Sequence, residues 1–439
     1  MTEYSHSQLR SIRPVSDLVP TPLISERTLL GSSAFTVSIA ILIGVVVPDL
    51  LHPWAMSMIS HSPAVTIFGI RASFYGSILA IVIGHISLSR FTSLPTINAK
   101  AYVLPSFLLS YTAVLALVYV LSTPFGHFHF FISFLIVVPW YLTIAVLRER
   151  HIRTRIALVG TGPHPIIDEV QSIEWSLLDI PVLDRPVSAI VVDANTPLAP
   201  EWQHFIAQAV LQGIPVYDIR YIREALTRRV EITHMADNNF GSIMPALTYI
   251  RVKRMIDVIL GIPALMVAAP AILVFAVLIR LESPGPAIFR QQRIGFRGVP
   301  FTFYKLRSMR DGVPGALFTR DDDDRITRVG AFIRKYRIDE LPQIWNIVRG
   351  DMSWIGPRPE AVGLARFYEE NIPLFIYRHA VRPGISGWAA VHQGNVAELD
   401  AATVKLQYDF FYIKYCSLWL DALIFLMTMR TIVTGYGSR

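Results

Sequence analysis

Val258-Ile-Leu-Gly-Ile-Pro-Ala-Leu-Met-Val-Ala-Ala-Pro-Ala-Ile-Leu-Val-Phe-Ala-Val-Leu-Ile279 is a run of 22 residues without a charged side chain. A helix of about 20 apolar residues is long enough to cross a bilayer core of about 30 Å. However, Pro270 lies near the centre of the run, where a proline removes a backbone hydrogen bond and clashes with the preceding turn. Length alone therefore leaves two paths open, a proline-kinked spanning helix and a helix that breaks within the membrane.

The residues on either side of this run favour the second path. Lys253 and Arg254 precede it, and Arg280 follows it directly. Positive charges collect on the cytoplasmic side of a membrane, so basic flanks at both ends fit no single orientation of a spanning helix well. We predict that residues 255–281, approximately, form a re-entrant helix that breaks at Pro270 and enters and leaves by the same face.

Four stretches in the first half of the chain are also apolar and long enough to span. They cover residues 32–51, 72–88, 101–121 and 128–147. The chain is 52% hydrophobic and only 17% charged, against about 25% charged in soluble domains, which excludes an entirely soluble or disordered protein. Its one cysteine, Cys416, excludes an internal disulfide. We expect an α-helical bundle of four transmembrane helices over residues 32–150.

Basic residues in the short loops orient this bundle. They occur in the tail at residues 1–31, in the second loop and after the fourth span, whereas the third loop has none. By the positive-inside rule, the tail and the end of the bundle both lie in the cytoplasm. His85, near the end of the second span, suits an interfacial position better than a proton relay. The bundle is therefore expected to be an anchor and not a transporter.

Residues 151–248 change to short apolar runs between helical patterns and predict a small Rossmann-like α/β domain. Buried parallel strands are expected at 156–160, 189–193 and 214–219, with a crossover helix at 201–211. Gly160 and Gly162 follow the first strand, where a dinucleotide fold has its phosphate turn, but Pro165 replaces the third glycine. Nucleotide binding and a docking or regulatory role both stay open.

Residues that can carry chemistry gather at positions 283–394. A strand-like alternation puts Lys305 and Arg307 on one face, beside two phenylalanines. Two such cations could hold a pyrophosphate, or they could lie on a solvated edge. Arg358 stands between two prolines and Arg382 in a loop rich in glycine and proline, which makes both candidates for binding phosphate.

The segment Arg337-Ile-Asp-Glu-Leu-Pro-Gln343 is more informative. Asp339 suits a helix N-cap with Pro342 in the first turn, which is a purely structural interpretation. The same geometry suits phosphate chemistry, because a helix N-terminus binds phosphate and keeps a nucleophilic carboxylate ionised. Glu340, about a third of a turn away, could hold Mg²⁺, which prefers oxygen ligands.

Seven spaced motifs in one order give residues 249–439 a specific resemblance. They are Lys253-Arg-Met-Ile-Asp257, Ser283-Pro-Gly-Pro286, Tyr304-Lys-Leu-Arg-Ser-Met309, Ile338-Asp-Glu-Leu-Pro-Gln343, Gly350-Asp-Met-Ser353, Gly356-Pro-Arg-Pro359 and Arg382-Pro-Gly-Ile-Ser-Gly-Trp388. This section resembles the bacterial sugar transferase family, the monotopic phosphoglycosyl transferases. The resemblance implies an α+β catalytic domain, anchored by a re-entrant membrane helix and by interfacial amphipathic helices. We assign one of these amphipathic helices to residues 418–429.

The resemblance also implies roles for the matching positions. Asp339 would be the nucleophile that forms a covalent aspartyl-phosphosugar, and Glu340 would coordinate Mg²⁺. Arg334 and Arg358 would bind phosphate, and Asp409 matches a carboxylate associated with the site. With Lys305, Arg307 and Arg382, these residues make up the predicted site.

The implied reaction moves a hexose-1-phosphate from a UDP-hexose to polyprenyl (undecaprenyl) phosphate and releases UMP. It would be the first membrane step of exopolysaccharide, capsule or O-antigen synthesis. The expected location is the bacterial inner (plasma) membrane, with the catalytic domain on the cytoplasmic face and a homodimer as one arrangement. The net charge of +7 is too diffuse to indicate nucleic acid.

One segment departs from the family pattern, and two other classes of function are alternatives. The family's Gln-Val-Asn-Gly-Arg becomes Ala390-Val-His-Gln-Gly394 here, which puts the contacts to the nucleotide or sugar in doubt. A silent scaffold is one alternative, opposed by the intact Asp339-Glu340 pair. A nucleotide-sugar dehydratase or epimerase is another, opposed by the incomplete dinucleotide fingerprint.

Overall fold

The computed structural model describes most of the chain in eleven segments. They are residues 32–50, 64–91, 99–122, 126–151, 155–160, 165–170, 173–194, 196–231, 247–310, 325–393 and 399–434. The predicted tail at 1–31, Gly162 of the glycine turn and Gly394 lie outside them. The chain divides into two compact units, Met1–Thr227 and Arg228–Arg439. The expected catalytic domain at 249–439 lies within the second unit, and its bounds stay a prediction.

The first part of unit one is helical. Its elements are α1 (Ser33–Ile41), the π-helical turn η3 (Leu42–Val46), α3 (Ala64–Phe91), α4 (Ala99–Val120) and α5 (His127–His151). Segments long and apolar enough to cross a membrane are Ser33–Leu50, Arg71–Ser89, Ala99–Val120 and His127–Arg148. They overlap the four stretches expected from the sequence. A membrane-spanning four-helix bundle stays a prediction.

Close packing and polar contacts join these helices. A Cβ atom at Gly84 on α3 would lie 2.7 Å from the ring of Phe107 on α4, so only glycine allows this approach. The hydroxyl groups of Tyr111 on α4 and Ser133 on α5 lie 2.8 Å apart in a hydrogen bond. Small residues and interhelical hydrogen bonds of this kind hold apolar helices together in lipid.

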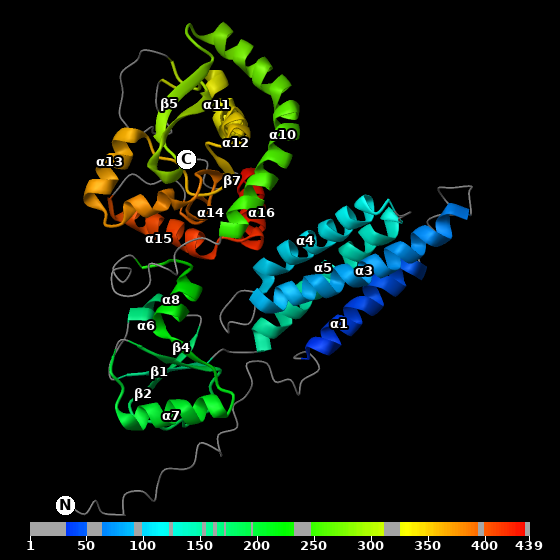
Figure 1. Cartoon of the computed structure of the whole chain (residues 1–439), viewed down its shortest axis with the longest axis vertical. Helices are drawn as coiled ribbons and strands as arrows, with labels where there is room; N and C mark the ends of the chain where they lie inside the picture. Colours follow the sequence, from blue (N-terminus) through cyan, green and yellow to red (C-terminus); the bar gives the residue numbers. More distant parts are fainter. Residues whose placement is uncertain are drawn as a thin grey trace, which may run out of the picture. The chain divides into compact units, whose positions relative to one another are not determined.

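Residues 155–227 form a mixed α/β region around a four-stranded parallel sheet of order β2-β1-β3-β4. Its elements are β1 (Arg155–Val159), α6 (Pro165–Glu169), β2 (Glu174–Leu178), β3 (Ala189–Val192), α7 (Pro200–Leu211), β4 (Val216–Asp218) and α8 (Ile219–Thr227). Alternate residues of β1 face opposite sides: Ala157 packs toward α7, and Ile156 packs toward α6 and α8 (Figure 1). The sequence did not predict β2, because its residues are mostly exposed or half-buried and lack a continuous apolar run. The Rossmann-like layout stays a prediction.

Unit two combines a long helix with short strands and helices. Its elements are α10 (Leu247–Glu282), β5 (Ile288–Ile294), η5 (Phe296–Gly298), β6 (Pro300–Leu306), α11 (Arg328–Lys335), η6 (Ile338–Glu340), α12 (Gln343–Arg349), β7 (Ser353–Ile355), α13 (Val362–Asn371), η7 (Phe375–Ala380), β8 (Gly384–Ser386), α14 (Trp388–His392), α15 (Leu399–Tyr415) and α16 (Leu418–Thr434). Strands β5 and β6 pair antiparallel, and β7 and β8 pair parallel. Phe301 and Phe303 of β6 form a buried cluster with Ile347 of α12, which fixes that helix against the hairpin.

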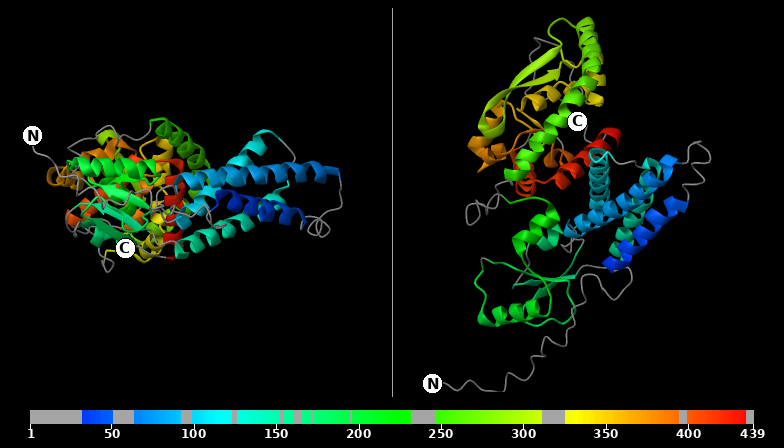
Figure 2. Two further views of the ribbon diagram at one scale, coloured as in Figure 1. Left: turned by 90° about the horizontal axis from the view of Figure 1, so that it is seen from below. Right: turned by 45° about the vertical axis from the view of Figure 1, so that its right-hand side comes forward.

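Helix α10 runs without interruption through Pro263 and Pro270 and is a fifth segment apolar enough to span. At Pro270 the helix therefore continues, although a break was expected, and its ribbon curves along the unit beside α11 and α12 (Figures 1 and 2). Buried or half-buried positions recur every three or four residues along its length, among them Gly261 and Ala268. The opposite face is apolar and exposed, with Val267 80% exposed. The helix is thus packed on one face only, and its re-entrant path stays a prediction.

Candidate functional site

The two candidate carboxylates lie in a tight 3-10 turn. Arg337 precedes the turn with a left-handed backbone (φ 57°), a conformation that costs a non-glycine residue about 1 kcal/mol or more. Asp339 and Glu340 follow in η6, and the N-cap of α12 is Pro342. The expected N-cap role of Asp339 is therefore wrong. Proline suits the start of a helix because the N–H group it lacks would be unpaired there.

Both carboxylates are buried among cations. Asp339 is 2% exposed and Glu340 is 7% exposed. Lys305, near the end of β6, has its Nζ 2.6 Å from Asp339 Oδ2 and 3.7 Å from Glu340 Oε1. Arg358 donates from Nη2 to Glu340 Oε1 at 2.7 Å, and Arg337 Nη1 lies 3.6 Å from the same oxygen. Three cations thus surround two carboxylates and leave a net positive charge.

The charges of this cluster stabilise one another. Burial by itself would raise the pKa of Glu340, but Arg358 and Lys305 outweigh burial and lower the pKa to about 2. In return, Glu340 raises the pKa of Arg358. Both groups are therefore charged at neutral pH. A fixed, positively charged cluster of this kind is suited to stabilising negative charge on a phosphate.

Arg307 and Arg382, two other predicted phosphate ligands, bind backbone carbonyl groups. Arg307 is 6% exposed and donates to the carbonyl oxygens of Ser283 and Pro284, both at 2.7 Å. Arg382 donates from Nε to the carbonyl oxygen of Gly350 at 3.0 Å. Each guanidinium thus holds a turn of the unit in place. Phosphate binding by either stays a prediction.

Arg334 and Asp409 also lie apart from the ion-pair cluster among the described residues. Arg334 is in the last turn of α11, and its carbonyl oxygen accepts a hydrogen bond from the amide of Arg337 at 3.2 Å. Asp409 is 1% exposed on α15 and accepts a hydrogen bond from Arg378 Nη2 at 2.8 Å. Of the predicted residues, the structure therefore joins only Lys305, Asp339, Glu340 and Arg358 into one ion-pair cluster.

The sequence analysis missed two arginines near the site. Arg337 stands within the quoted motif, but only the backbone geometry shows that its side chain turns back to Glu340. Arg378 belongs to η7 and contacts residues of α15 and of the loop that carries Arg358, far from it in sequence. No local pattern indicates such contacts.

The carboxylate pair fits a magnesium ion that binds together with a substrate. The described part of the chain has no cluster of three or more His, Cys, Asp or Glu side chains that could hold a metal. Mg²⁺ usually takes one or two protein carboxylates and completes its shell with water and substrate phosphates. Glu340, the predicted ligand, provides one such carboxylate next to Asp339.

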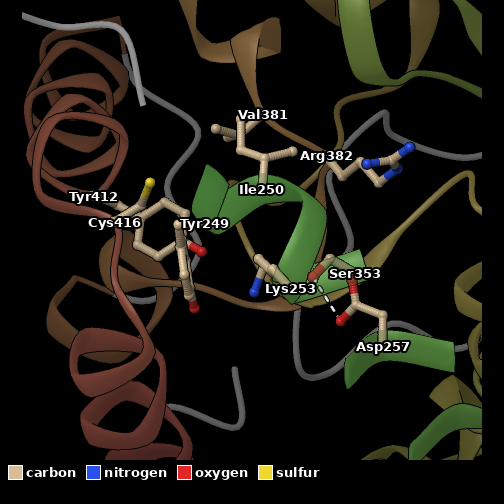
Figure 3. A pocket seen from close by; sticks show the side chains of 9 residues that line it. All are labelled: Tyr249, Ile250, Lys253, Asp257, Ser353, Val381, Arg382, Tyr412 and Cys416. Atoms are coloured by element: carbon tan, nitrogen blue, oxygen red, sulfur yellow. Dashed lines mark hydrogen bonds between the residues drawn. The ribbon is translucent and has the colours of Figure 1, made fainter. Parts of the chain in front are cut away.

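A small pocket lies at the start of α10 (Figure 3). It is lined by Tyr249, Ile250, Lys253, Asp257, Ser353, Val381, Arg382, Tyr412 and Cys416. Beside it, Asp421 of α16 accepts hydrogen bonds from Tyr249 (2.5 Å) and Tyr412 (2.8 Å), and it forms an ion pair with Lys253. Asp421 thus ties α10 to α15 and α16. The predicted interfacial helix at 418–429 turns its one charge into the protein.

Residues 248–435 match the family model described as bacterial sugar transferase. The chain is also 41% identical over 368 residues to the UDP-N-acetylgalactosamine-undecaprenyl-phosphate N-acetylgalactosaminephosphotransferase of Aeromonas hydrophila. This alignment covers 83% of this chain and 87% of that protein. The chain belongs to the bacterial sugar transferase family. The resemblance seen in the sequence is therefore confirmed, and the protein is a transferase.

Other relatives of this sugar transferase match mainly one part of it. The UDP-glucose:undecaprenyl-phosphate glucose-1-phosphate transferase of Caulobacter vibrioides is 40% identical over 198 residues, 44% of this chain and 74% of that protein. The Escherichia coli protein of the same name is 38% identical over 181 residues, 40% of this chain and 39% of that protein. The alignment with the Aeromonas protein thus covers a much larger part of the chain.

Proposed function

We propose that this sugar transferase moves a sugar 1-phosphate from a UDP-sugar to polyprenyl (undecaprenyl) phosphate and releases UMP. The observation that carries the proposal is the buried Asp339-Glu340 pair, surrounded by Lys305, Arg337 and Arg358. The names of the Aeromonas, Caulobacter and Escherichia relatives support both substrate classes. A relative named as an exopolysaccharide production protein supports a role in exopolysaccharide synthesis.

In the first step, a carboxylate oxygen of Asp339 attacks the phosphorus that bears the sugar. A bond forms between these two atoms, the bond from phosphorus to the bridging oxygen breaks, and UMP leaves with that oxygen and its electron pair. Lys305 and Arg358 balance the negative charge that grows on the phosphate oxygens. The ion pair between Lys305 and Asp339 has to open for this attack, and the diphosphate offers Lys305 a replacement anion.

In the second step, an oxygen of the polyprenyl phosphate attacks the same phosphorus. The new phosphorus–oxygen bond forms as the bond to Asp339 breaks, which restores the carboxylate and yields a polyprenyl-diphosphate sugar. No oxidant or reductant is required. A covalent intermediate of this kind divides one difficult transfer into two easier ones. It also lets UMP, the soluble product of the donor, leave before the lipid acceptor arrives.

Glu340 would hold Mg²⁺ in the substrate complex, beside the nucleophile Asp339. The ion supplies positive charge for the diphosphate when it is bound. Arg358 and Arg337, which share one oxygen of Glu340, would then turn toward the phosphate groups.

The exposed face of α10 supports a position at the membrane surface. Strongly exposed apolar residues on it are Met255, Ile259, Met266, Val267, Leu273 and Leu281. The other face packs along its length, because Arg254 holds the end of α12 and Phe275 stacks on Phe332 of α11 at 6.0 Å. A helix with one packed face and one free apolar face can bury the free face in the membrane interface. We propose that the catalytic domain lies on the cytoplasmic face of the bacterial inner membrane, with α10 as a re-entrant helix.

Transfer of radiolabel tests the function and the nucleophile together. We expect UDP-sugar labelled at the phosphate next to the sugar to leave label on the acid-quenched wild-type chain and to release UMP. Asp339→Asn should do neither, whereas the control Asp400→Asn, at an exposed position of α15, should behave as wild type. Wild-type UMP release by Asp339→Asn would refute the nucleophile.

A panel of UDP-sugars identifies the donor. UDP-N-acetylgalactosamine is the first choice, because the alignment with the Aeromonas relative covers 83% of this chain. UDP-glucose, UDP-galactose and UDP-N-acetylglucosamine complete the panel. If the detergent-solubilised wild type released UMP from none of them in the presence of undecaprenyl phosphate, the proposed function would be wrong.

A further inference from the structure

Two arginines from other elements, one buried and one half-buried, hold the backbone that carries Arg358. Arg378 of η7 donates from Nη2 to the carbonyl oxygen of Arg358 at 2.9 Å. Arg293 of β5 donates from Nη1 to the carbonyl oxygen of Pro359 at 2.7 Å. Backbone hydrogen bonds hold this segment on either side of Arg358, from Gly356 to Ser386 (2.8 Å), from Gly384 to Pro357 (3.0 Å) and from Ile294 to Glu360 (3.0 Å). Between them, the carbonyl groups of Arg358 and Pro359 are held by the two arginines.

Arg378 is itself fixed by a buried network of charges. Its side chain is 2% exposed, and the same Nη2 that reaches Arg358 also donates to Asp409 Oδ2 at 2.8 Å. Its Nη1 lies 3.5 Å from Glu360 Oε1, and that oxygen also accepts a hydrogen bond from Lys405 at 2.6 Å. Two cations and two carboxylates balance in this network. A guanidinium enclosed in this way has a single orientation, because buried charges are stable only when they are paired.

The Arg358 guanidinium contacts two groups at once. It donates to Glu340 Oε1 at 2.7 Å and to the carbonyl oxygen of Ile385 at 3.3 Å. A shift of the Arg358 backbone would change both distances. A displacement of about 1 Å in a group that positions substrate can cost about 10²-fold in rate.

We propose that Arg378 and Asp409 are positioning residues for Arg358. Asp409 orients Arg378, Arg378 fixes the carbonyl group of Arg358, and the side chain of Arg358 then reaches the carboxylate pair in a defined direction. Asp409 acts through two arginines and does not touch substrate. The consequence for catalysis rests on the proposed function, whereas the structural relationship does not.

Enzyme kinetics on the full chain test the consequence. Arg378→Lys keeps the charge beside Asp409, but a single ammonium group cannot reproduce the fork that also holds the Arg358 carbonyl. We expect kcat/KM for UMP release to fall by about 10-fold to 100-fold. In an Arg358→Lys background the same substitution should cost less than about 3-fold, because the group that it positions is absent. Additive effects would overturn the proposal.

Arg254→Lys is the matched control. Arg254 also donates to two backbone carbonyl groups, those of Ile347 (2.6 Å) and Val348 (2.8 Å). Both arginine variants should lower Tm, but the effect of Arg254→Lys on kcat/KM should add to that of Arg358→Lys. If Arg378→Lys acted only through a general loss of stability, its effect on kcat/KM would add to that of Arg358→Lys, as for Arg254→Lys. If Arg378 positions Arg358, only the effect of Arg254→Lys should be additive.

Hydrogen exchange tests the structural relationship without any assay of activity. In Arg378→Lys and in Asp409→Asn, the amides of Gly356, Arg358 and Glu360 should exchange about 10-fold faster than in the wild type. Arg254→Lys should leave them unchanged. Unchanged exchange in Arg378→Lys would overturn the proposal. If the wild type released UMP from no UDP-sugar, the proposed function would fail alone, and exchange would still decide the position of Arg358.

Discussion

Lys305 and Asp339 form an ion pair of 2.6 Å that joins the end of β6 to the η6 turn. The carboxylate is almost completely buried, whereas the lysine side chain keeps 26% of its exposure. The lysine is therefore the partner that can exchange its anion for one that arrives from solvent. In the proposed reaction, Lys305 holds the nucleophile before the donor binds and holds the donor afterwards.

Replacing Lys305 tests this exchange. Lys305→Met keeps most of the side-chain volume and removes the charge, so the diphosphate loses one of its cations. We expect kcat/KM for UMP release to fall by about 10²-fold or more, as for the loss of other charge-stabilising donors. Lys305→Arg should retain more activity because it keeps the charge. Unchanged kinetics in Lys305→Met would remove Lys305 from the mechanism.

Glu340→Gln tests the proposed metal site. The amide is a poorer ligand for Mg²⁺ than the carboxylate, so the Mg²⁺ concentration for half-maximal UMP release should rise by about 10-fold. A Mg²⁺ titration of the variant beside the wild type and Asp400→Asn measures this change. The same half-maximal concentration in all three proteins would show that Glu340 does not hold the ion.

The buried glutamates predict how stability depends on pH. The pKa of Glu340 is lowered to about 2, and so is that of Glu360, where Lys405 and Arg378 outweigh the effect of burial. A change from 4.5 to about 2 corresponds to about 3 kcal/mol for each group. Because the folded pKa is the lower one, this stabilisation is complete above about pH 4.5 and is lost as the pH falls toward 2.

Thermal unfolding in detergent between pH 2 and pH 6 measures this dependence. The wild type should lose Tm steadily below about pH 4.5. Glu360→Gln should start from a lower Tm at pH 6 and change less over the same window, because one of the two titrating groups is gone. Parallel curves for the two proteins would mean that Glu360 makes no ionic contribution to folding.

Replacing Arg307 distinguishes a structural role of this residue from a role in phosphate binding. It holds the carbonyl groups of Ser283 and Pro284 at the end of α10. Arg307→Lys should therefore lower Tm by several degrees and leave KM for the UDP-sugar unchanged. A raised KM at an unchanged Tm would instead support the phosphate contact predicted from the sequence.

The sequence identified the carboxylate turn and two of its cations because they lie in short motifs. Strand periodicity predicted Lys305 and Arg307 on one face of the strand, whereas in the structure only Lys305 pairs with Asp339. Strand β6 ends at Leu306, so the alternation no longer applies at the next residue. Asp409 and Arg378 meet only in the folded chain, across 31 positions, and no pattern of one segment can show such a pair.

The sequence pattern of helix α10 does not predict which of its faces packs on the protein. Its central run is apolar all round, so periodicity cannot tell the face that packs on protein from the face that is free. The packed face becomes visible only when α11 and α12 are in place. Pro270 likewise predicts a disturbance of the helix, but whether the helix bends or ends there depends on the packing around it.

The path of α10 through the membrane can be tested at its two ends. Arg251 and Arg280 are exposed, so cysteine at either position is open to a membrane-impermeant maleimide. In a Cys416→Ser background, a re-entrant helix predicts that Arg251→Cys and Arg280→Cys are labelled in inverted membrane vesicles and protected in intact spheroplasts. A spanning helix predicts opposite results for the two positions. Ser122→Cys, in the loop expected outside the cytoplasm, is the control and should be labelled in spheroplasts. Labelling of Arg280→Cys from outside would contradict the re-entrant path. The site residues Lys305, Asp339 and Glu340 follow Arg280 in the chain, so a cytoplasmic donor would then have no access to them.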